Sequence, residues 1–290
     1  ILVGQSNMQG HGQLSTIPYM AADPATKPLH DKIVDASGEP RVHEDVRIVA
    51  YSEAGKGNHK EKRGPLTMGY GSNLGSETVC GPELAFGITM REKVDGPILI
   101  IKTAWGGKSL NTDFRPPSAG KYQLHPKIKA LWDQHPDGAH GIPKMDERPA
   151  WRAKKDEATG HYYRLMIEHV EATLANLKAA HPAYDPEQGY EMAGLVWFQG
   201  WNDMCDGTTY PDSRNDPDAY AQYSTLFGHF IRDVRKALKA PKLPVVIGVI
   251  GVGGDKAQGG IANLRPAMAA PADLPEFKGT VAAVQTKDFW

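Results

Sequence analysis

The chain has 290 residues, of which 40% are hydrophobic and 23% charged, with a formal net charge of −1 at pH 7. This suits one large α/β domain or two small ones. A net charge near zero gives no sign of the basic surface that binds nucleic acid or an anionic membrane. No apolar run approaches the ~20 residues of a membrane span. Two cysteines, Cys80 and Cys205, fit neither a disulfide framework nor a zinc motif. We expect both to be free, buried thiols, with one bridge between them as the alternative.

Apolar runs of strand length recur along the chain and are continuous rather than alternating. They span residues 1–3, 46–51, 97–103, 193–198, 244–250 and 280–286. Continuous runs are typical of strands buried on both faces, as in a parallel sheet. Helical patterns fall between them, at residues 82–94, 162–180 and 216–240. This alternation predicts an α/β fold, a three-layer α/β/α sandwich with a mostly parallel sheet.

Two stretches interrupt the rhythm, at about residues 10–76 and 111–151. Both are rich in Gly, Pro, His or charge, and the first contains only one predicted strand. Long loops in a compact domain are usually functional or disordered, so we expect them to form the walls of a substrate cleft, with mobile surface insertions as the alternative. We predict a single domain over residues 1–290. We also expect a fragment truncated at both ends, because the chain starts inside a strand without Met and stops directly after another.

The first ten residues place a serine directly after a predicted strand. Residues 1–3 end the strand, and the turn Gly4-Gln5-Ser6-Asn7 follows. Ligands and catalytic groups collect at the carboxyl ends of strands in an open α/β sheet, so Ser6 is a candidate nucleophile. The alternative is an ordinary N-cap serine. The α/β-hydrolase elbow Gly-x-Ser-x-Gly is excluded, because Met8 stands where its second glycine belongs.

Three further segments carry candidate chemistry. Gly81-Pro82-Glu83 opens a predicted helix, where unpaired N–H groups and the absence of a Cβ suit a backbone donor, although most such starts are structural. The segment at residues 104–109 follows another strand, and the block at residues 197–203 follows a third, presenting the Gln199 amide, a donor that does not titrate. Nucleotide-binding loops are excluded, because Lys102 and Lys256 stand where the required glycines belong.

These four segments, in this order, resemble the SGNH hydrolases, in particular the branch of sialate O-acetylesterases and carbohydrate acetylesterases. The block Trp197-Phe198-Gln199-Gly200-Trp201-Asn202-Asp203 is similar to the family's Trp-x-Gln-Gly-Glu-x-Asp, with Trp201 in place of the glutamate. The resemblance implies a flavodoxin-like fold with long loop insertions. It also implies a serine carboxylic-ester hydrolase that removes O-acetyl groups from sialic acid or another carbohydrate through an acyl-enzyme, and a secreted or extracytoplasmic location.

The resemblance also implies a role for each site residue. Ser6 is the expected nucleophile, and the N–H groups of Ser6 and Gly81 with the Gln199 amide form the expected oxyanion hole. No metal or organic cofactor is implied, and the expected partner is an acetylated carbohydrate. Asn202 and Asp203 have the alternative of fixing their loop through side-chain to backbone bonds. The residues expected to line the substrate site are Gln5, Asn7, Trp105, Gly106, Gly107, Lys108, Trp201, Asn202 and Asp203.

The family's base is a histidine near the C-terminus, preceded by an aspartate three residues earlier. No histidine follows His229 in this chain. We therefore expect the base beyond Trp290. The alternative is His140, in the segment at residues 137–140, which lies before the Gln199 block and so in the wrong order. His11 is expected to have a capping or solvated role, with a place in the lining of the pocket as the alternative.

A different class of function is a non-catalytic carbohydrate-binding protein or pseudoenzyme on the same fold. Trp105, Trp201 and Tyr210 would then stack on sugar rings without chemistry. A phosphoesterase or lipase on this fold is a third, weaker interpretation, because the Gln-Gly pair and the Trp-Gly-Gly-Lys segment favour the carbohydrate branch.

Overall fold

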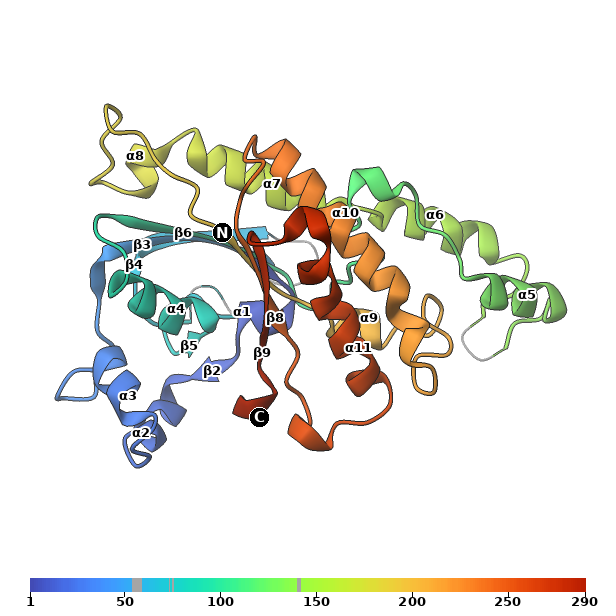
Figure 1. The fold of residues 1–290 in the computed structure, drawn as a ribbon, viewed down its shortest axis with the longest axis horizontal. Coiled ribbons are helices and arrows are strands. Elements are labelled where there is room, and N and C mark those ends of the chain that lie inside the picture. The colour runs from blue at the N-terminus through green and yellow to red at the C-terminus, as the bar shows by residue number, and fades with distance from the viewer. Residues whose placement is uncertain (54–58, 73, 75, 140–141) are drawn as a thin grey trace. The chain divides into compact units, whose positions relative to one another are not determined.

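The computed structural model describes residues 1–53, 59–72, 74, 76–139 and 142–290 (Figure 1). The chain forms two compact units, which we describe separately. Unit 1 comprises Ile1–Gly107 and Glu168–Phe198, and unit 2 comprises Lys108–Ile167 and Gln199–Trp290. The organisation of residues 1–290 as one domain stays a prediction.

The sheet of unit 1 has the strand order β4-β3-β6-β1-β7. Its strands are parallel except β4, which is antiparallel to β3 at the edge. A short antiparallel pair, β2 with β5, lies outside this sheet. The strands of unit 1 are β1 (Leu2–Gly4), β2 (Gly12–Gln13), β3 (His43–Glu53), β4 (His59–Leu66), β5 (Val79–Cys80), β6 (Ile98–Ala104) and β7 (Leu195–Phe198).

Helices cover both faces of this sheet, with α4 (Pro82–Arg91) on one side and the end of α7 (His161–Leu174) with α8 (Leu177–Ala180) on the other (Figure 1). On the α4 side, a Cβ added to Gly87 would lie 3.3 Å from Val46 of β3. Alternate strand residues point to opposite faces, so Tyr51 points the other way, where its ring stacks on His169 of α7 at 3.8 Å. The predicted α/β class with a mostly parallel sheet is confirmed, and unit 1 has three layers.

The core of unit 1 forms where α4 packs on the sheet. The buried side chains Val46, Ile48 and Ala50 of β3 alternate with residues of the opposite face, as a strand covered on both sides requires. The other helices of unit 1 are short: α1 (Ser6–Gln9), α2 (Ile17–Met20) and α3 (Lys27–Ile33).

Unit 2 contains the parallel pair β8 (Val245–Val249) and β9 (Val281–Gln285). Its longest helix, α10 (Ala221–Ala237), buries Tyr223, Phe227 and Phe230 at helical spacing, as predicted. Its other α-helices are α5 (Pro126–Gln134), α6 (Arg148–Ala158), the first half of α7, α9 (Trp201–Met204) and α11 (Gly260–Ala269). Single 3-10 turns across the two units are η1 (Leu14–Thr16), η2 (Pro117–Ala119), η3 (Pro217–Tyr220), η4 (Gly254–Lys256), η5 (Ala270–Asp273), η6 (Pro275–Phe277) and η7 (Lys287–Phe289).

The structure corrects several predicted elements. The helix expected over residues 162–180 is interrupted between α7 and α8, and the one expected over 216–240 begins as a 3-10 turn. The stretch at 111–151 is not structureless, because it contains α5 and the start of α6. Their tryptophans Trp132 and Trp151 pack edge to face at 4.9 Å. The stretch at 10–76 contains α2, α3 and β4 besides the predicted β3.

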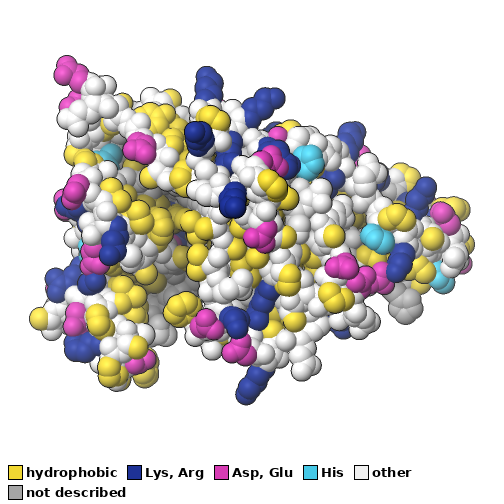
Figure 2. Space-filling model, in the orientation of Figure 1, with side chains coloured by type: hydrophobic (Ala, Val, Ile, Leu, Met, Phe, Trp, Pro, Cys, Tyr) yellow, Lys and Arg dark blue, Asp and Glu magenta, His cyan; other side chains and the backbone are white. Residues whose placement is uncertain are grey.

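Charged side chains of both signs are interspersed over the face drawn in Figure 2, in keeping with a net charge of −1. Among the described residues, no helix combines the length and the apolar character needed to cross a membrane. Both cysteines are free thiols, as expected, but only Cys80 is partly buried, whereas Cys205 is exposed.

Candidate active site

Ser6 lies at the carboxyl end of β1, which is flanked by β6 and β7 in the sheet of unit 1. It is the first residue of α1 and is partly exposed. The N-cap is Gln5, so the alternative of Ser6 as an N-cap serine is wrong. A Cβ on Gly4 would meet the Phe198 carbonyl oxygen at 2.2 Å, so only glycine fits at the strand end that leads into this turn.

Gly81 and Gly106 both approach α1 closely within unit 1. A Cβ on Gly81 would lie 2.4 Å from the Gln9 carbonyl oxygen. A Cβ on Gly106 would lie 2.8 Å from the Gln9 Oε1 and 3.9 Å from the Ser6 Cβ. The structure therefore brings two of the predicted glycines against the helix that carries Ser6.

The Gly81 N–H donates to the Glu83 Oε1 at 2.7 Å. Gly81 is the N-cap of α4, in an extended conformation, and the acceptor is the second residue of that helix. The proposed oxyanion donor therefore already has an acceptor, and its role in an oxyanion hole, which stays a prediction, requires this bond to be shared or exchanged.

A buried ion pair lies behind Gly81, and the sequence interpretation missed it. The Lys102 Nζ contacts the Glu83 Oε2 at 2.5 Å, and the two side chains are 3% and 0% exposed. Burial lowers the pKa of Lys102, and the negative charge of Glu83 opposes that shift. The sequence contained a signal for this pair, a lysine inside the apolar strand β6 and a glutamate at the start of α4, because a buried charge requires a partner of opposite charge.

Gln199 is anchored within unit 2 by its side chain. Its Nε2 donates to the Asp203 Oδ2 at 2.6 Å and to the Lys108 carbonyl oxygen at 3.1 Å. Its Oε1 accepts from the Tyr223 hydroxyl at 3.1 Å, which fixes the orientation of the amide. The Asn202 Nδ2 also donates to the Lys108 carbonyl, at 3.2 Å. Both amide hydrogens of Gln199 therefore have acceptors, and its convergence with Ser6 stays a prediction.

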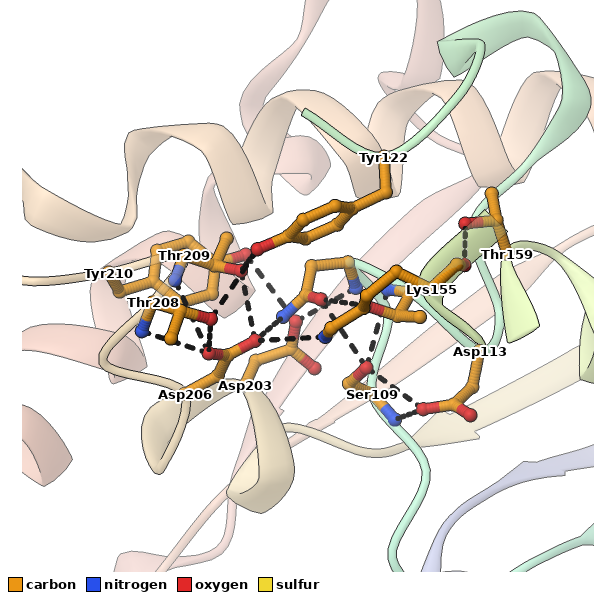
Figure 3. Close-up of polar contacts among 12 residues, drawn as sticks. Ser109, Asp113, Tyr122, Lys155, Thr159, Asp203, Asp206, Thr208, Thr209 and Tyr210 are labelled. Atoms are coloured by element: carbon orange, nitrogen blue, oxygen red, sulfur yellow. Dashed lines mark hydrogen bonds and ion pairs between the residues drawn. The ribbon is translucent and has the colours of Figure 1, made fainter. Parts of the chain in front are cut away.

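Asp203 is fully buried and joins the Gln199 block to the loop after residue 107 (Figure 3). Its carboxylate accepts from the Leu110 N–H at 2.7 Å and from the Asn111 N–H at 2.9 Å. The Tyr210 hydroxyl donates to it at 3.4 Å. Burial raises the pKa of Asp203 to about 6, although these hydrogen bonds oppose the shift. These side-chain to backbone bonds hold the segment at Leu110 and Asn111, and the role of Asp203 in a substrate site stays a prediction.

A wider polar network surrounds Asp203 in unit 2 (Figure 3). Asp206 accepts from the Asn111 amide at 3.2 Å and from the hydroxyls of Thr208 and Thr209 at 2.6 and 2.9 Å. The Lys155 Nζ lies 4.0 Å from the Asp206 Oδ2 and 4.6 Å from the centre of the Tyr122 ring. Sequence reasoning did not identify this network, because its members are spread over residues 109–210.

The residues predicted to line a substrate site differ in burial. Gln5, Trp105 and Asp203 are fully buried. The other predicted lining residues, Asn7, Gly106, Gly107, Lys108, Trp201 and Asn202, are partly or largely exposed, and their role stays a prediction. Of the aromatic residues assigned to sugar stacking, Trp105 and Tyr210 are buried, and Trp201 is 37% exposed.

The position of the proposed base beyond Trp290 stays a prediction. Within the described part of unit 1, the Ser6 hydroxyl has no hydrogen bond to a histidine. His11 is exposed in that unit, and His140 lies outside the described residues. Among the described residues, no group of three or more His, Cys, Asp and Glu side chains is placed to hold a metal ion.

The mostly parallel sheet defines an α/β protein of the class that binds its ligands at the carboxyl ends of the strands, where Ser6 lies. The sequence matches the family described as "Carbohydrate esterase, sialic acid-specific acetylesterase" over residues 1–133 and 138–288. The chain belongs to this family of carbohydrate esterases.

Comparison with solved structures gives distant similarity. A protein of Arabidopsis thaliana shares 15% identity with a TM-score of 0.46, over 98% of this chain and 84% of that one. A protein of Xanthomonas citri, described as a novel carbohydrate acetylesterase, shares 16% identity with a TM-score of 0.48. That match covers 99% of this chain and 49% of the Xanthomonas protein, so the chain spans about half of its length. No curated protein matches the sequence.

Proposed function

We propose that this chain is a serine esterase that removes O-acetyl groups from a carbohydrate, either sialic acid or another acetylated sugar. The observation that carries the proposal is the position of Ser6, at the first residue of the helix that follows the central strand β1. Its support is the family membership and the pairing of Gly4 with Phe198, the residue directly before Gln199.

In the proposed reaction, the Ser6 Oγ attacks the acetyl carbonyl carbon and its proton passes to a histidine base from beyond Trp290. The tetrahedral intermediate collapses, the C–O bond to the sugar breaks, and the base returns the proton to the sugar oxygen. Water then hydrolyses the acetyl-enzyme to acetate by the same route. No metal or organic cofactor takes part in these steps.

The proposed oxyanion donors are the N–H groups of Ser6 and Gly81 and the Gln199 amide. Gln199 would turn to the oxyanion the hydrogen that now donates to Lys108, the longer of its two bonds. The Lys108 carbonyl would still have the Asn202 amide as a donor, so no buried acceptor is left unsatisfied. The bond to Asp203 would be kept.

The test uses the full-length protein that contains this chain, with 4-nitrophenyl acetate and a panel of acetylated sugars. Ser6→Ala should reduce hydrolysis to the uncatalysed background, since loss of the nucleophile costs ~10⁶ in kcat in a serine protease. Ser37→Ala, an exposed serine of the same unit, is the matched control and should leave kcat unchanged. Sugar binding by a wild-type protein without hydrolysis would instead support the carbohydrate-binding alternative.

A further inference from the structure

The buried ammonium of Lys102 uses all of its donors on fixed partners in unit 1. Its Nζ donates to the Gln9 carbonyl at 2.8 Å, the Tyr70 carbonyl at 2.8 Å and the Glu83 Oε2 at 2.5 Å. An ammonium has three N–H groups, so this arrangement saturates it. Charged groups are buried at a large desolvation cost, which makes an ion pair in an otherwise apolar strand a feature that needs a reason.

One of these partners is the last residue of the helix that begins with Ser6. Helix α1 has four residues, and the bonds that close its turns are Gln9 N–H to the Gln5 carbonyl at 2.8 Å and Gly10 N–H to the Ser6 carbonyl at 2.9 Å. So short a helix is not stable by itself, because nucleation costs more than one turn returns. Its geometry therefore depends on external contacts, and Lys102 contacts it at the carbonyl of its last residue.

The other partner of Lys102 links it to Gly81. Glu83 binds Lys102 through Oε2 and the Gly81 N–H through Oε1. Lys102 also neutralises this carboxylate. An uncompensated negative charge 2.7 Å from the Gly81 nitrogen would oppose an oxyanion formed at the same N–H.

We propose that the buried Lys102–Glu83 ion pair is a positioning device that holds the nucleophile helix α1 and Gly81 in one fixed arrangement. This inference rests on the proposed function, in which Ser6 and Gly81 act on the same ester. The pair touches no substrate. Its effect is exerted through the backbone of Gln9 and Gly81, and it therefore alters kcat rather than substrate binding.

The test compares Lys102→Met with wild type in the full-length protein, using 4-nitrophenyl acetate below the unfolding transition. We expect kcat per folded molecule to fall about 100-fold with KM unchanged, because a displacement of about 1 Å at reacting groups costs that much. The double variant Lys102→Met/Glu83→Gln removes both charges and should regain part of the kcat. If Lys102→Met does not fold, Glu83→Gln, which keeps the shape and the acceptor for Gly81, replaces it and should lower kcat with KM unchanged.

Arg235→Met is the matched control for loss of a buried cation. Arg235 donates to the Leu243 carbonyl at 2.9 Å and to the Thr280 hydroxyl at 2.8 Å, all within unit 2. This variant should lower the melting temperature without lowering kcat per folded molecule. An unchanged kcat per folded molecule in Lys102→Met overturns the positioning role. If Lys102→Met does not fold, an unchanged kcat in Glu83→Gln overturns it.

Hydrogen exchange at the Gly10 N–H separates this inference from the proposed function. That amide closes the last turn of α1 and should exchange faster in Lys102→Met than in Arg235→Met, whether or not the protein hydrolyses esters. Faster exchange with no Ser6-dependent hydrolysis in wild type would retain the link between the ion pair and α1 and overturn the esterase proposal. Equal exchange in the two variants would overturn the link itself.

Discussion

The amide of Gln199 donates to the carboxylate of Asp203 at 2.6 Å, across the single turn of α9. The acceptor is fully buried and also accepts the N–H groups of Leu110 and Asn111. One carboxylate thus sets the orientation of the proposed oxyanion donor and the path of the loop that follows residue 107. The two functions cannot be separated by mutating Asp203 alone, whereas a substitution of Gln199 removes only the amide.

Gln199→Ala should lower kcat about 100- to 1,000-fold with little change in KM in the full-length enzyme. The amide is proposed to donate to charge that develops only in the transition state, and one such donor is worth about 3–4 kcal/mol of the barrier. Gln188→Ala, at an exposed position, should leave both constants unchanged. An unaltered kcat on an aryl acetate would remove Gln199 from the catalytic site.

Asp203 should make the stability of the protein depend on pH between about 4 and 6. Its folded pKa, about 6, lies above the ordinary value of 3.8, so the folded protein binds its proton more tightly than the unfolded chain. The stability from this group is therefore complete below the lower value and is lost as pH rises through the higher one. The shift corresponds to about 3 kcal/mol.

Urea unfolding of wild type and Asp203→Asn at a series of pH values measures this effect. Asparagine does not titrate, so the difference in unfolding free energy between the two proteins should fall by about 2 kcal/mol from pH 4 to pH 7, most of the full effect. A difference that is constant with pH would show that Asp203 has an ordinary pKa in the folded protein.

The apolar strands and the long helices were predictable, because burial on one or both faces leaves a period in the sequence. Strand β4 was not, since its residues Lys60–Arg63 are charged and its exposed edge position imposes no apolar pattern. Helix α6 buries none of its residues, so it has no apolar stripe to detect. Both elements follow from tertiary context that local periodicity does not record.

The site was predictable to the extent that its residues lie next to strand ends. Ser6, Gly81 and Gln199 follow from short contiguous segments. The Lys102–Glu83 pair joins two such segments through space, and each residue alone has ordinary explanations. Gly81 and Gln199 also have internal acceptors for their donors, which the identity of the residues could not reveal.

Gly4→Ala should destabilise the protein by at least ~2 kcal/mol, because its methyl group would overlap the Phe198 carbonyl oxygen, 2.2 Å away. The Met8 Cβ and the Phe198 carbonyl carbon would each lie 2.8 Å away, and neither is the flexible end of a side chain that could move aside. Gly207→Ala is the control, since an added Cβ there has open space. Thermal unfolding should show a lower melting temperature for the first variant and a value near wild type for the second. Equal melting temperatures would contradict the close approach of β1 and β7.

Trp201 should contribute to the binding of sugar but not to the chemistry. It is the aromatic residue of the Gln199 block whose side chain is exposed, at 37%. Packing of one aromatic ring on a flat partner is worth on the order of 1 kcal/mol, so Trp201→Ala should raise KM for an acetylated oligosaccharide about 3- to 10-fold.

The same substitution should leave both constants for 4-nitrophenyl acetate unchanged, because that substrate has no sugar to stack. Trp201→Phe keeps a ring and should retain most of the affinity, whereas Tyr190→Ala, which removes a 55% exposed ring in the other unit, should have no effect on either substrate. Steady-state kinetics on the two substrates distinguishes a role of Trp201 in sugar binding from a role in the chemistry. A fall in kcat on the aryl ester would mean that Trp201 shapes the reacting centre, and equal KM values for the oligosaccharide would mean that it does not contact the sugar.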